Sequence, residues 1–494
     1  MRIQLEDAQA LSDLRSMTRE GSVAQAFPNL NRFVDEACKT SAARPDSVSL
    51  PMFGVLARNP RFRRLWWSQV VSQAGDWLNR MACLALIGQL GGPRGALGIL
   101  FGLELALRLL PAAVLGPFVG PIGDRVPRRL LMVASDLSRA AVVLSFLLVR
   151  EPSQLPLLYA LIALQMALGI FFDVARNAAL PDTVSSEDLH EAHSLSAATW
   201  SVMLAVGALA GGFAVSWIGT QGVFELDAAS YVVSALFLTG LRLSPLAAHA
   251  RPLRARSWLL LEDLRDAWVH ARERQVGVVL WAKAFWGAAG GFLVVLSLAG
   301  PDRYHESTAG GSLGAIAFAT GVLYSARGLG TGFGPTLARQ WLGTGDRALK
   351  LQIAAGFVIA ALGYTLFGFA ENLVWAATCV AFAHLGGSAL WVASTVAWQR
   401  HVEDPFRARV FALEYFAMNL AFGLGGMLAG IVYDKTHSLA WTAWVVSAAV
   451  AVLGAVWSAL ALRRSAPSPE GLGMAGANGS GRFGRTPQIE LDRP

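Results

Sequence analysis

Long apolar segments, separated by short polar ones, run through most of the chain. A helix that crosses a bilayer needs about 20 mostly apolar residues. By this measure the sequence predicts twelve spanning helices in two groups of six: 64–90, 97–121, 129–149, 156–177, 193–218 and 223–243, then 276–300, 311–335, 348–370, 373–397, 407–433 and 438–462. The pattern therefore indicates an all-α polytopic membrane protein made of two six-helix bundles.

The polar segments divide the chain into five regions. Residues 1–57 lack the apolar stretch of a signal peptide, so we expect a partly disordered cytoplasmic tail. The first bundle spans 58–243 and the second 276–463. The interval 244–275 is predicted to be a cytoplasmic linker that ends in an amphipathic helix, and residues 464–494, rich in Gly, Pro and Ser, are expected to be disordered.

Composition supports the membrane prediction. Of the 494 residues 54% are hydrophobic and only 15% are charged, whereas soluble proteins usually carry about 25% charge. The net charge of +7 does not indicate nucleic-acid binding, because most Lys and Arg residues lie in short loops beside apolar segments. With the N-terminus inside, few of them fall in outer loops. We therefore expect an inner-membrane protein whose two termini are both cytoplasmic.

Catalytic and metal-binding motifs are missing from the sequence. It contains no G-x-S-x-G, H-E-x-x-H or Walker A motif. Its three cysteines, Cys38, Cys83 and Cys379, are too far apart to suggest a metal site or a disulfide framework. The sequence thus predicts no enzyme activity, no cofactor and no metal, and any uphill transport would have to draw on an ion gradient.

A basic turn joins the second and third predicted helices. Glycines let the chain bend at little steric cost, Asp124 can cap the outgoing helix, and the arginines hold the turn on the cytoplasmic side. These residues are Gly120, Gly123, Asp124, Arg125, Arg128 and Arg129. The segment resembles the loop between helices 2 and 3 of the major facilitator superfamily, with the pattern G-x-x-x-D-R-x-G-R-R/K, although Pro127 replaces its second glycine. The resemblance implies the major facilitator fold, alternating access and an inner gate at this loop.

Small residues recur four apart in four predicted helices, at Gly116/Gly120, Gly207/Gly211, Gly328/Gly332 and Gly426/Gly430. Such pairs let helices approach closely in lipid. In the superfamily these helices, 2, 5, 8 and 11, form the contact between the two halves. The run Gly207, Gly211 and Gly212 also resembles the G-P-x-x-G-G motif of exporters, with Ala208 in place of proline. Segments 62–77 and 172–181 are similar to a bacterial drug- and siderophore-efflux branch.

Ionisable residues inside the spans are costly and are therefore functional candidates. Acidic and basic residues recur at helical spacings of three or four, which allows ion pairs on one helix face. The pairs are Asp76/Arg80, Glu104/Arg108, Asp136/Arg139 and Asp173/Arg176. The last two are predicted to lie near the cytoplasmic end, where they would join Asp124 and Arg125 in a charge network. Each pair can instead be purely structural.

Asp76 and Glu104 are the candidates for proton or substrate coupling, with Arg80 and Arg108 beside them. A carboxylic acid withdrawn from water can bind and release a proton near neutral pH, and the change of charge can bias a two-state motion. His384 has the chemistry of a proton relay, although a buried His can also be simply hydrogen-bonded. We expect the remaining charges, Lys283, Arg327 and Glu414, near the inner surface.

The sequence therefore predicts a monomeric secondary transporter, a proton-coupled exporter of amphipathic small molecules such as drugs or siderophores. The partners it implies are a small-molecule substrate, protons and the bilayer. Two alternatives remain open. One is a transporter of lysophospholipids or nutrients without proton antiport, and the other is a receptor or scaffold of the same fold.

Overall fold

The computed structural model describes residues 51–91, 96–123, 126–243, 260–274, 276–304 and 313–463. Within these ranges the regular elements are all helices. The described part of the chain before Asn59 is one short helix, α4 (Pro51–Arg58), which belongs to a unit separate from the rest. Everything that follows concerns the unit that begins at Asn59.

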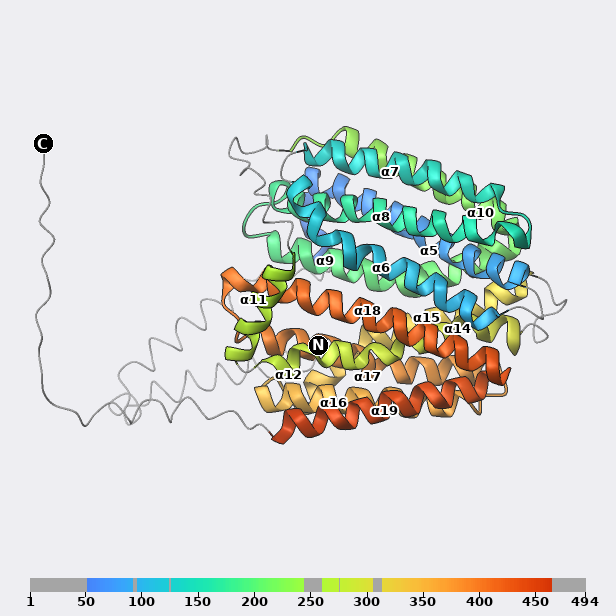
Figure 1. Cartoon of the computed structure of the whole chain (residues 1–494). Helices are drawn as coiled ribbons and strands as arrows, with labels where there is room; N and C mark the ends of the chain where they lie inside the picture. Colours follow the sequence, from blue (N-terminus) through green and yellow to red (C-terminus); the bar gives the residue numbers. More distant parts are fainter. Residues whose placement is uncertain are drawn as a thin grey trace, which may run out of the picture. The chain divides into compact units, whose positions relative to one another are not determined.

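The first half of this unit contains five long helices and a shorter one, running side by side (Figure 1). They are α5 (Pro60–Gly91), α6 (Leu97–Gly123), α7 (Arg128–Ser145), α8 (Leu155–Ala179), α9 (Leu189–Val202) and α10 (Ala208–Thr239). Within α10 the backbone is kinked at Gly219, whose φ of 73° lies in a region that glycine adopts without steric cost, so the element consists of two helices that meet there. The predicted fifth and sixth spans meet at this residue.

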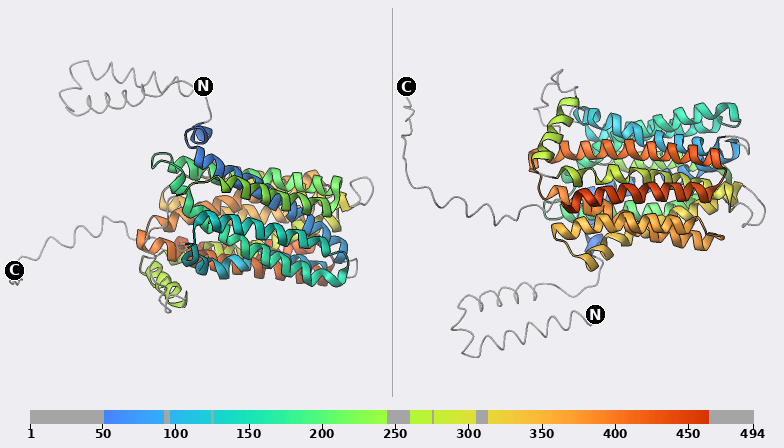
Figure 2. Two further views of the ribbon diagram at one scale, coloured as in Figure 1. Left: turned by 90° about the horizontal axis from the view of Figure 1, so that it is seen from above. Right: turned by 60° about the horizontal axis from the view of Figure 1, so that its bottom comes forward.

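The second half begins with α11 (Leu260–Glu273), which lies within the predicted linker and contacts α18. The predicted seventh span is broken into short pieces, α12 (Gly277–Leu280), α13 (Ala282–Phe285) and α14 (Gly290–Asp302). Five long helices follow, and Figure 2 shows them from two further directions: α15 (Leu313–Leu342), α16 (Asp346–Phe367), α17 (Leu373–Gln399), α18 (Asp404–Thr436) and α19 (Leu439–Arg463).

In the described part of the chain, nine helical segments are long and apolar enough to cross a membrane. One of them, Glu191–Thr239, is 49 residues long and contains the Gly219 break. The long helices α5 and α15 fall outside this set because they carry more polar residues. With these counted, the arrangement is consistent with the twelve predicted spans.

The two halves meet along two helix pairs, as predicted for helices 2, 5, 8 and 11. In the first pair α6 packs against α18, and a Cβ added to Gly430 would lie 2.2 Å from the Gly98 carbonyl oxygen. In the second pair α10 packs against α15, and a Cβ on Gly212 would lie 2.5 Å from the Ala317 carbonyl oxygen. Backbones this close leave no room for side chains at these glycines.

The predicted glycine pairs do not all face the opposite half. Gly207 and Gly211 pack against Trp77 and Leu78 of α5, in their own half. Gly328 does meet Ala205 of the opposite half, whereas a Cβ added to Gly332 would have none of the described atoms within 4 Å. The surroundings of Gly116 and Gly120 lie outside the described residues.

A π-helical segment, Met203–Gly207, directly precedes Ala208, the position at which the exporter motif would have proline. A π-helical turn distorts a helix, as a proline kink does. The fifth span is therefore irregular beside the position of the missing proline, and the irregularity comes from the backbone hydrogen bonding instead of from a proline ring.

Candidate functional site

Asp76 lies on α5 with its side chain 33% exposed, and it contacts two other helices of the first half. The Tyr231 hydroxyl donates a hydrogen bond to one carboxylate oxygen. The Arg139 guanidinium is 3.8 Å from the other oxygen. Asp76 is thus reachable by small molecules on one side and held by polar partners on the other.

Arg139 is shared between two carboxylates. It donates to Asp136 at 2.5 Å, so the predicted ion pair between these residues is present. Ser234 donates to the second Asp136 oxygen at 2.6 Å, and Asp136 is fully buried. The guanidinium also lies 4.3 Å from the centre of the Tyr231 ring. The pair therefore joins the Asp76 site through Arg139, whereas a network with Asp124 and Arg125 lies outside the described residues.

Sequence reasoning missed Asp227, which lies on α10 near Asp76. Its side chain is 0% exposed, and Ser230 Oγ is 3.3 Å from one oxygen. Its second oxygen has no hydrogen-bond partner in the described structure. Helices α5 and α10 approach each other closely at Gly75, where an added Cβ would lie 2.3 Å from the Asp227 carboxylate. A signal was available, because Asp227 falls inside the predicted span 223–243.

Two of the other predicted pairs have different outcomes. Glu104 and Arg108 form a buried ion pair, as the spacing predicted. Asp173 and Arg176 do not, because Arg176 donates instead to the side chains of Gln69 and Asn177. Asp173 is an exposed side chain.

The fourth predicted pair, Asp76 with Arg80, is wrong. Arg80 points toward the opposite half, where it lies 5.2 Å from the centre of the Tyr324 ring on α15. Its Nη2 atom is 3.4 Å from the Tyr324 hydroxyl. The physical reason is that Arg139 and Tyr231 already contact Asp76, while the long Arg80 side chain reaches the interface with α15.

Lys283 and Glu414 of the second half do not reach water separately, contrary to expectation. Lys283 and Glu414 are 3% and 1% exposed and pair at 3.1 Å between α13 and α18. Pairing removes the need for either side chain to reach water. Arg327 lies in the middle of α15, 5.9 Å from the Tyr324 ring centre. His384 shares a hydrogen bond of 3.0 Å with the Tyr364 hydroxyl.

The arginines of the 120–130 loop hold neighbouring helix ends. Arg128 donates to the Ala178 carbonyl at 2.7 Å and to Asp182 at 2.9 Å. Arg129 donates to the Thr239 carbonyl at 3.3 Å. Cations are favourable at the C-terminal ends of helices, where carbonyl groups lack partners. Asp124 and Arg125 lie outside the described residues, and so do the surroundings of Gly120 and Gly123.

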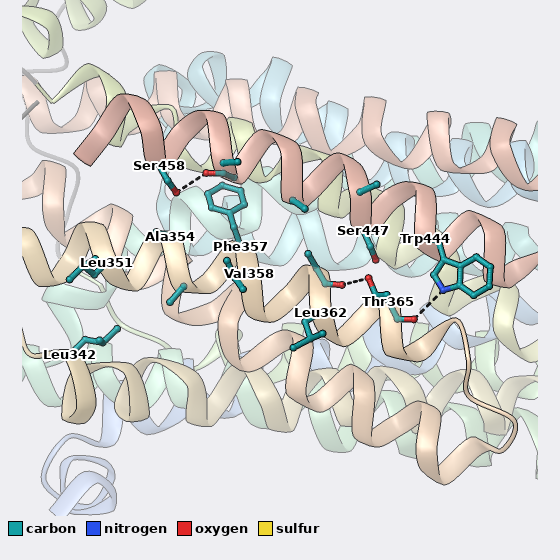
Figure 3. Close-up of a pocket in the computed structure, with 16 residues that line it drawn as sticks. Leu342, Leu351, Ala354, Phe357, Val358, Leu362, Thr365, Trp444, Ser447 and Ser458 are labelled. Atoms are coloured by element: carbon teal, nitrogen blue, oxygen red, sulfur yellow. Dashed lines mark hydrogen bonds between the residues drawn. The ribbon is translucent and has the colours of Figure 1, made fainter. Parts of the chain in front are cut away.

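A groove of about 800 Å³ lies elsewhere, between α16 and α19 (Figure 3). Its walls are mostly apolar, with Val358 and Leu362 exposed. The few polar groups are used locally, for example by Trp444, whose indole N–H donates to the Thr365 carbonyl at 3.1 Å. None of the charged candidates lines this groove.

Two helical bundles that hold charged side chains within apolar spans have the architecture of a membrane transporter. A sequence profile described as the Major Facilitator Superfamily matches residues 65–382. The match covers more than half of the chain, and the chain belongs to this superfamily. The resemblance drawn from the 120–130 loop is thereby confirmed.

Known relatives include proteins named as exporters. The chain is 24% identical over 390 residues to the putative bacilysin exporter BacE of Bacillus subtilis, and this alignment covers 78% of this chain and 92% of that protein. It is 22% identical over 384 residues to macrolide efflux protein A of Streptococcus pyogenes, over 76% of this chain and 90% of that protein. A solved structure of a bacterial homologue of the human lysosomal transporter Spinster has the same fold, with a TM-score of 0.60 and 16% identity over 82% of this chain and 97% of that one.

Proposed function

We propose that this transporter exports amphipathic small molecules in exchange for protons, by alternating access of its two halves. The observation that carries the proposal is Asp76, a partly exposed carboxylate that shares Arg139 with the buried Asp136. A proton can reach such a group, and its charge is coupled to groups that lie deeper in the bundle.

The proposed coupling follows from charge balance. With Asp76 ionised, Arg139 interacts with two carboxylates. Protonation of Asp76 removes one of them and leaves Arg139 with Asp136 alone. This change alters the charge of the face that the first half presents to a substrate, and a substrate or proton can shift a two-state equilibrium only through such a difference.

Export, as opposed to uptake, is supported by two observations. The relatives BacE and macrolide efflux protein A carry exporter names, and both align over most of their length. The Gly207–Gly212 segment resembles the exporter motif, and a π-helical segment precedes it. In this proposal the protein lies in the inner membrane with both termini in the cytoplasm.

The test is substrate-triggered proton movement in proteoliposomes with an imposed pH gradient. Lipophilic cations, macrolides, siderophores and lysolipids form the screening panel. We expect wild-type proton movement to be lost in Asp76→Asn and retained in Glu225→Gln, which changes an exposed carboxylate on α10. Substrate flux without proton movement, equal in wild type and Asp76→Asn, would instead support the lipid or nutrient transporter and assign Asp76 a structural role. Bound ligand without any flux would support a receptor.

A further inference from the structure

Two arginines from opposite halves lie against one tyrosine. Arg80 belongs to α5 and Arg327 to α15, and their guanidinium carbons are 5.2 and 5.9 Å from the centre of the Tyr324 ring. The ring is fully buried, and its hydroxyl lies 3.3 Å from the Leu293 carbonyl and 3.2 Å from Ser297. Tyr324 therefore has a fixed position beside two positive charges.

Neither arginine has a carboxylate partner among the residues that the structure describes. The Nε atom of each is buried without a hydrogen-bond partner there. Within the same ranges, the only hydrogen bond of Arg80 is the long one to Tyr324, at 3.4 Å. Arg108 and Arg139, by contrast, each pair with a carboxylate of their own helix. Two unpaired cations beside one buried ring inside a membrane are costly, and an anion bound to both would remove that cost.

The surroundings of the two arginines are aromatic. Trp77 lies 6.3 Å from the Tyr324 ring, and Arg80 lies 5.6 Å from the Trp77 ring. Tyr364 and His384, which share a hydrogen bond of 3.0 Å, lie within electrostatic range of Arg327. These groups offer ring faces and hydrogen bonds to a ligand, and no negative charge that would repel an anion.

We propose that Arg80 and Arg327 together bind the anionic group of the transported molecule, with Trp77 against its apolar part. Guanidinium groups bind carboxylate and phosphate oxygens through paired N–H donors, which an ammonium group cannot do as well. Because the arginines belong to different halves, the bound anion would bridge them. The inference rests on the proposed transport function and narrows its substrates to amphipathic molecules that carry a carboxylate or a phosphate.

The test measures binding alone, so that it is independent of proton coupling. The protein is reconstituted in phosphatidylcholine nanodiscs, and binding of N-dansyl-phenylalanine is compared with that of its neutral amide by energy transfer from tryptophan. We expect the carboxylate to bind about tenfold more tightly than the amide, in keeping with charge-assisted pairing. Arg80→Gln and Arg327→Gln should each bring this ratio close to one and leave the affinity for the amide almost unchanged.

Two controls separate the site from a purely structural role. Arg150→Gln removes an exposed arginine from a loop and should keep the wild-type ratio. Arg80→Lys keeps the charge without the paired donors and should keep only part of the ratio. An equal affinity for both probes in the wild type, or no binding of either, overturns the proposal. A wild-type ratio in both glutamine variants does so as well.

A last experiment shows whether the anion site accepts a lipid headgroup or only free organic anions. If added phosphatidylglycerol displaces the carboxylate probe from the wild type but not from Arg327→Gln, the anion site accepts a lipid headgroup. If it has no effect, the site selects free organic anions. Selective binding of the carboxylate without proton movement in proteoliposomes would support the anion site and reject proton antiport. Proton movement without selective binding of the carboxylate would support antiport and reject the anion site.

Discussion

The carboxylate of Asp434, close to the end of α18, accepts the backbone N–H groups of Gly98 at 2.7 Å and Ile99 at 2.9 Å. These N–H groups belong to the first turn of α6, where a helix has unpaired donors and a positive dipole end. Because α6 and α18 belong to different halves, this contact holds the halves together at the predicted outer end.

We expect Asp434→Asn to weaken closure of the outer end. Carboxylates at helix N-termini stabilise by about 0.3–2 kcal/mol, which corresponds to a shift of up to roughly 30-fold in a two-state population. Spin labels at Arg150 and Glu371, exposed residues in predicted outer loops of the two halves, would report the change by electron–electron distance measurement. The longer distance should become more populated.

Glu225→Gln is the matched control for that experiment, because Glu225 is an exposed acidic residue in the part of α10 that follows Gly219. Its distance distribution should equal that of the wild type. Identical distributions for Asp434→Asn and wild type would mean that the Asp434 contact does not hold the outer end closed.

Close packing of α6 on α18 gives a second prediction. Gly430→Ala would bring a methyl group to 2.2 Å from the Gly98 carbonyl oxygen, so the two backbones would have to separate. We expect transport to fall about tenfold or more, since overpacking costs about 1–3 kcal/mol. Gly332→Ala, whose methyl group would have no atom of the described structure within 4 Å, should transport as the wild type does. Equal loss in both variants would point to a general effect on membrane insertion.

Loss of Arg139 should destabilise the first half. Arg139→Gln leaves Asp136 buried without its cation, and removal of one partner of a buried pair costs about 3–5 kcal/mol. A thermal unfolding experiment in detergent should show a clear fall in the melting temperature. Arg128→Gln is the control, because it breaks a half-exposed ion pair with Asp182 and should cost at most about 1 kcal/mol. A smaller fall for Arg139→Gln than for Arg128→Gln would contradict the importance of the buried pair.

The role of the 120–130 loop as an inner gate gives a prediction from the sequence alone. Asp124→Asn removes the charge that we expect to cap the helix after the loop, while leaving the apolar segments unchanged. The variant should insert normally and lose most of its transport activity in proteoliposomes. Wild-type flux in a correctly inserted variant would reject the gating role.

The helices and the family could be predicted from the sequence, because both depend on local signals. Apolar length predicted the spans, and the loop motif indicated the superfamily. The partners of the charges depend on tertiary contacts, which spacing along one helix does not determine. Glu104 and Arg108 pair as their spacing suggests, whereas Asp76 and Arg80 have the same spacing and bind different helices.

The second half contains another tertiary contact that the sequence did not predict. Lys283 and Glu414 are far apart in sequence, and each was expected to reach the inner surface alone. In the structure they neutralise each other at 3.1 Å. A pairing of this kind leaves no local pattern in the sequence, since either residue would look the same with or without the other.

The π-helical segment Met203–Gly207 also determines which face of the fifth span meets which neighbour. A π-helical turn contains one residue more than an α-helical turn, and one residue corresponds to a rotation of about 100°. Deletion of one residue here would therefore turn the segment from Ala208 to Gly219 about its own axis. The glycines that now meet α5 and α15 would then face other neighbours. The extra residue thus fixes the rotation of the helix that follows it. Which residues are tolerated after Ala208 therefore depends on a turn that lies before Ala208.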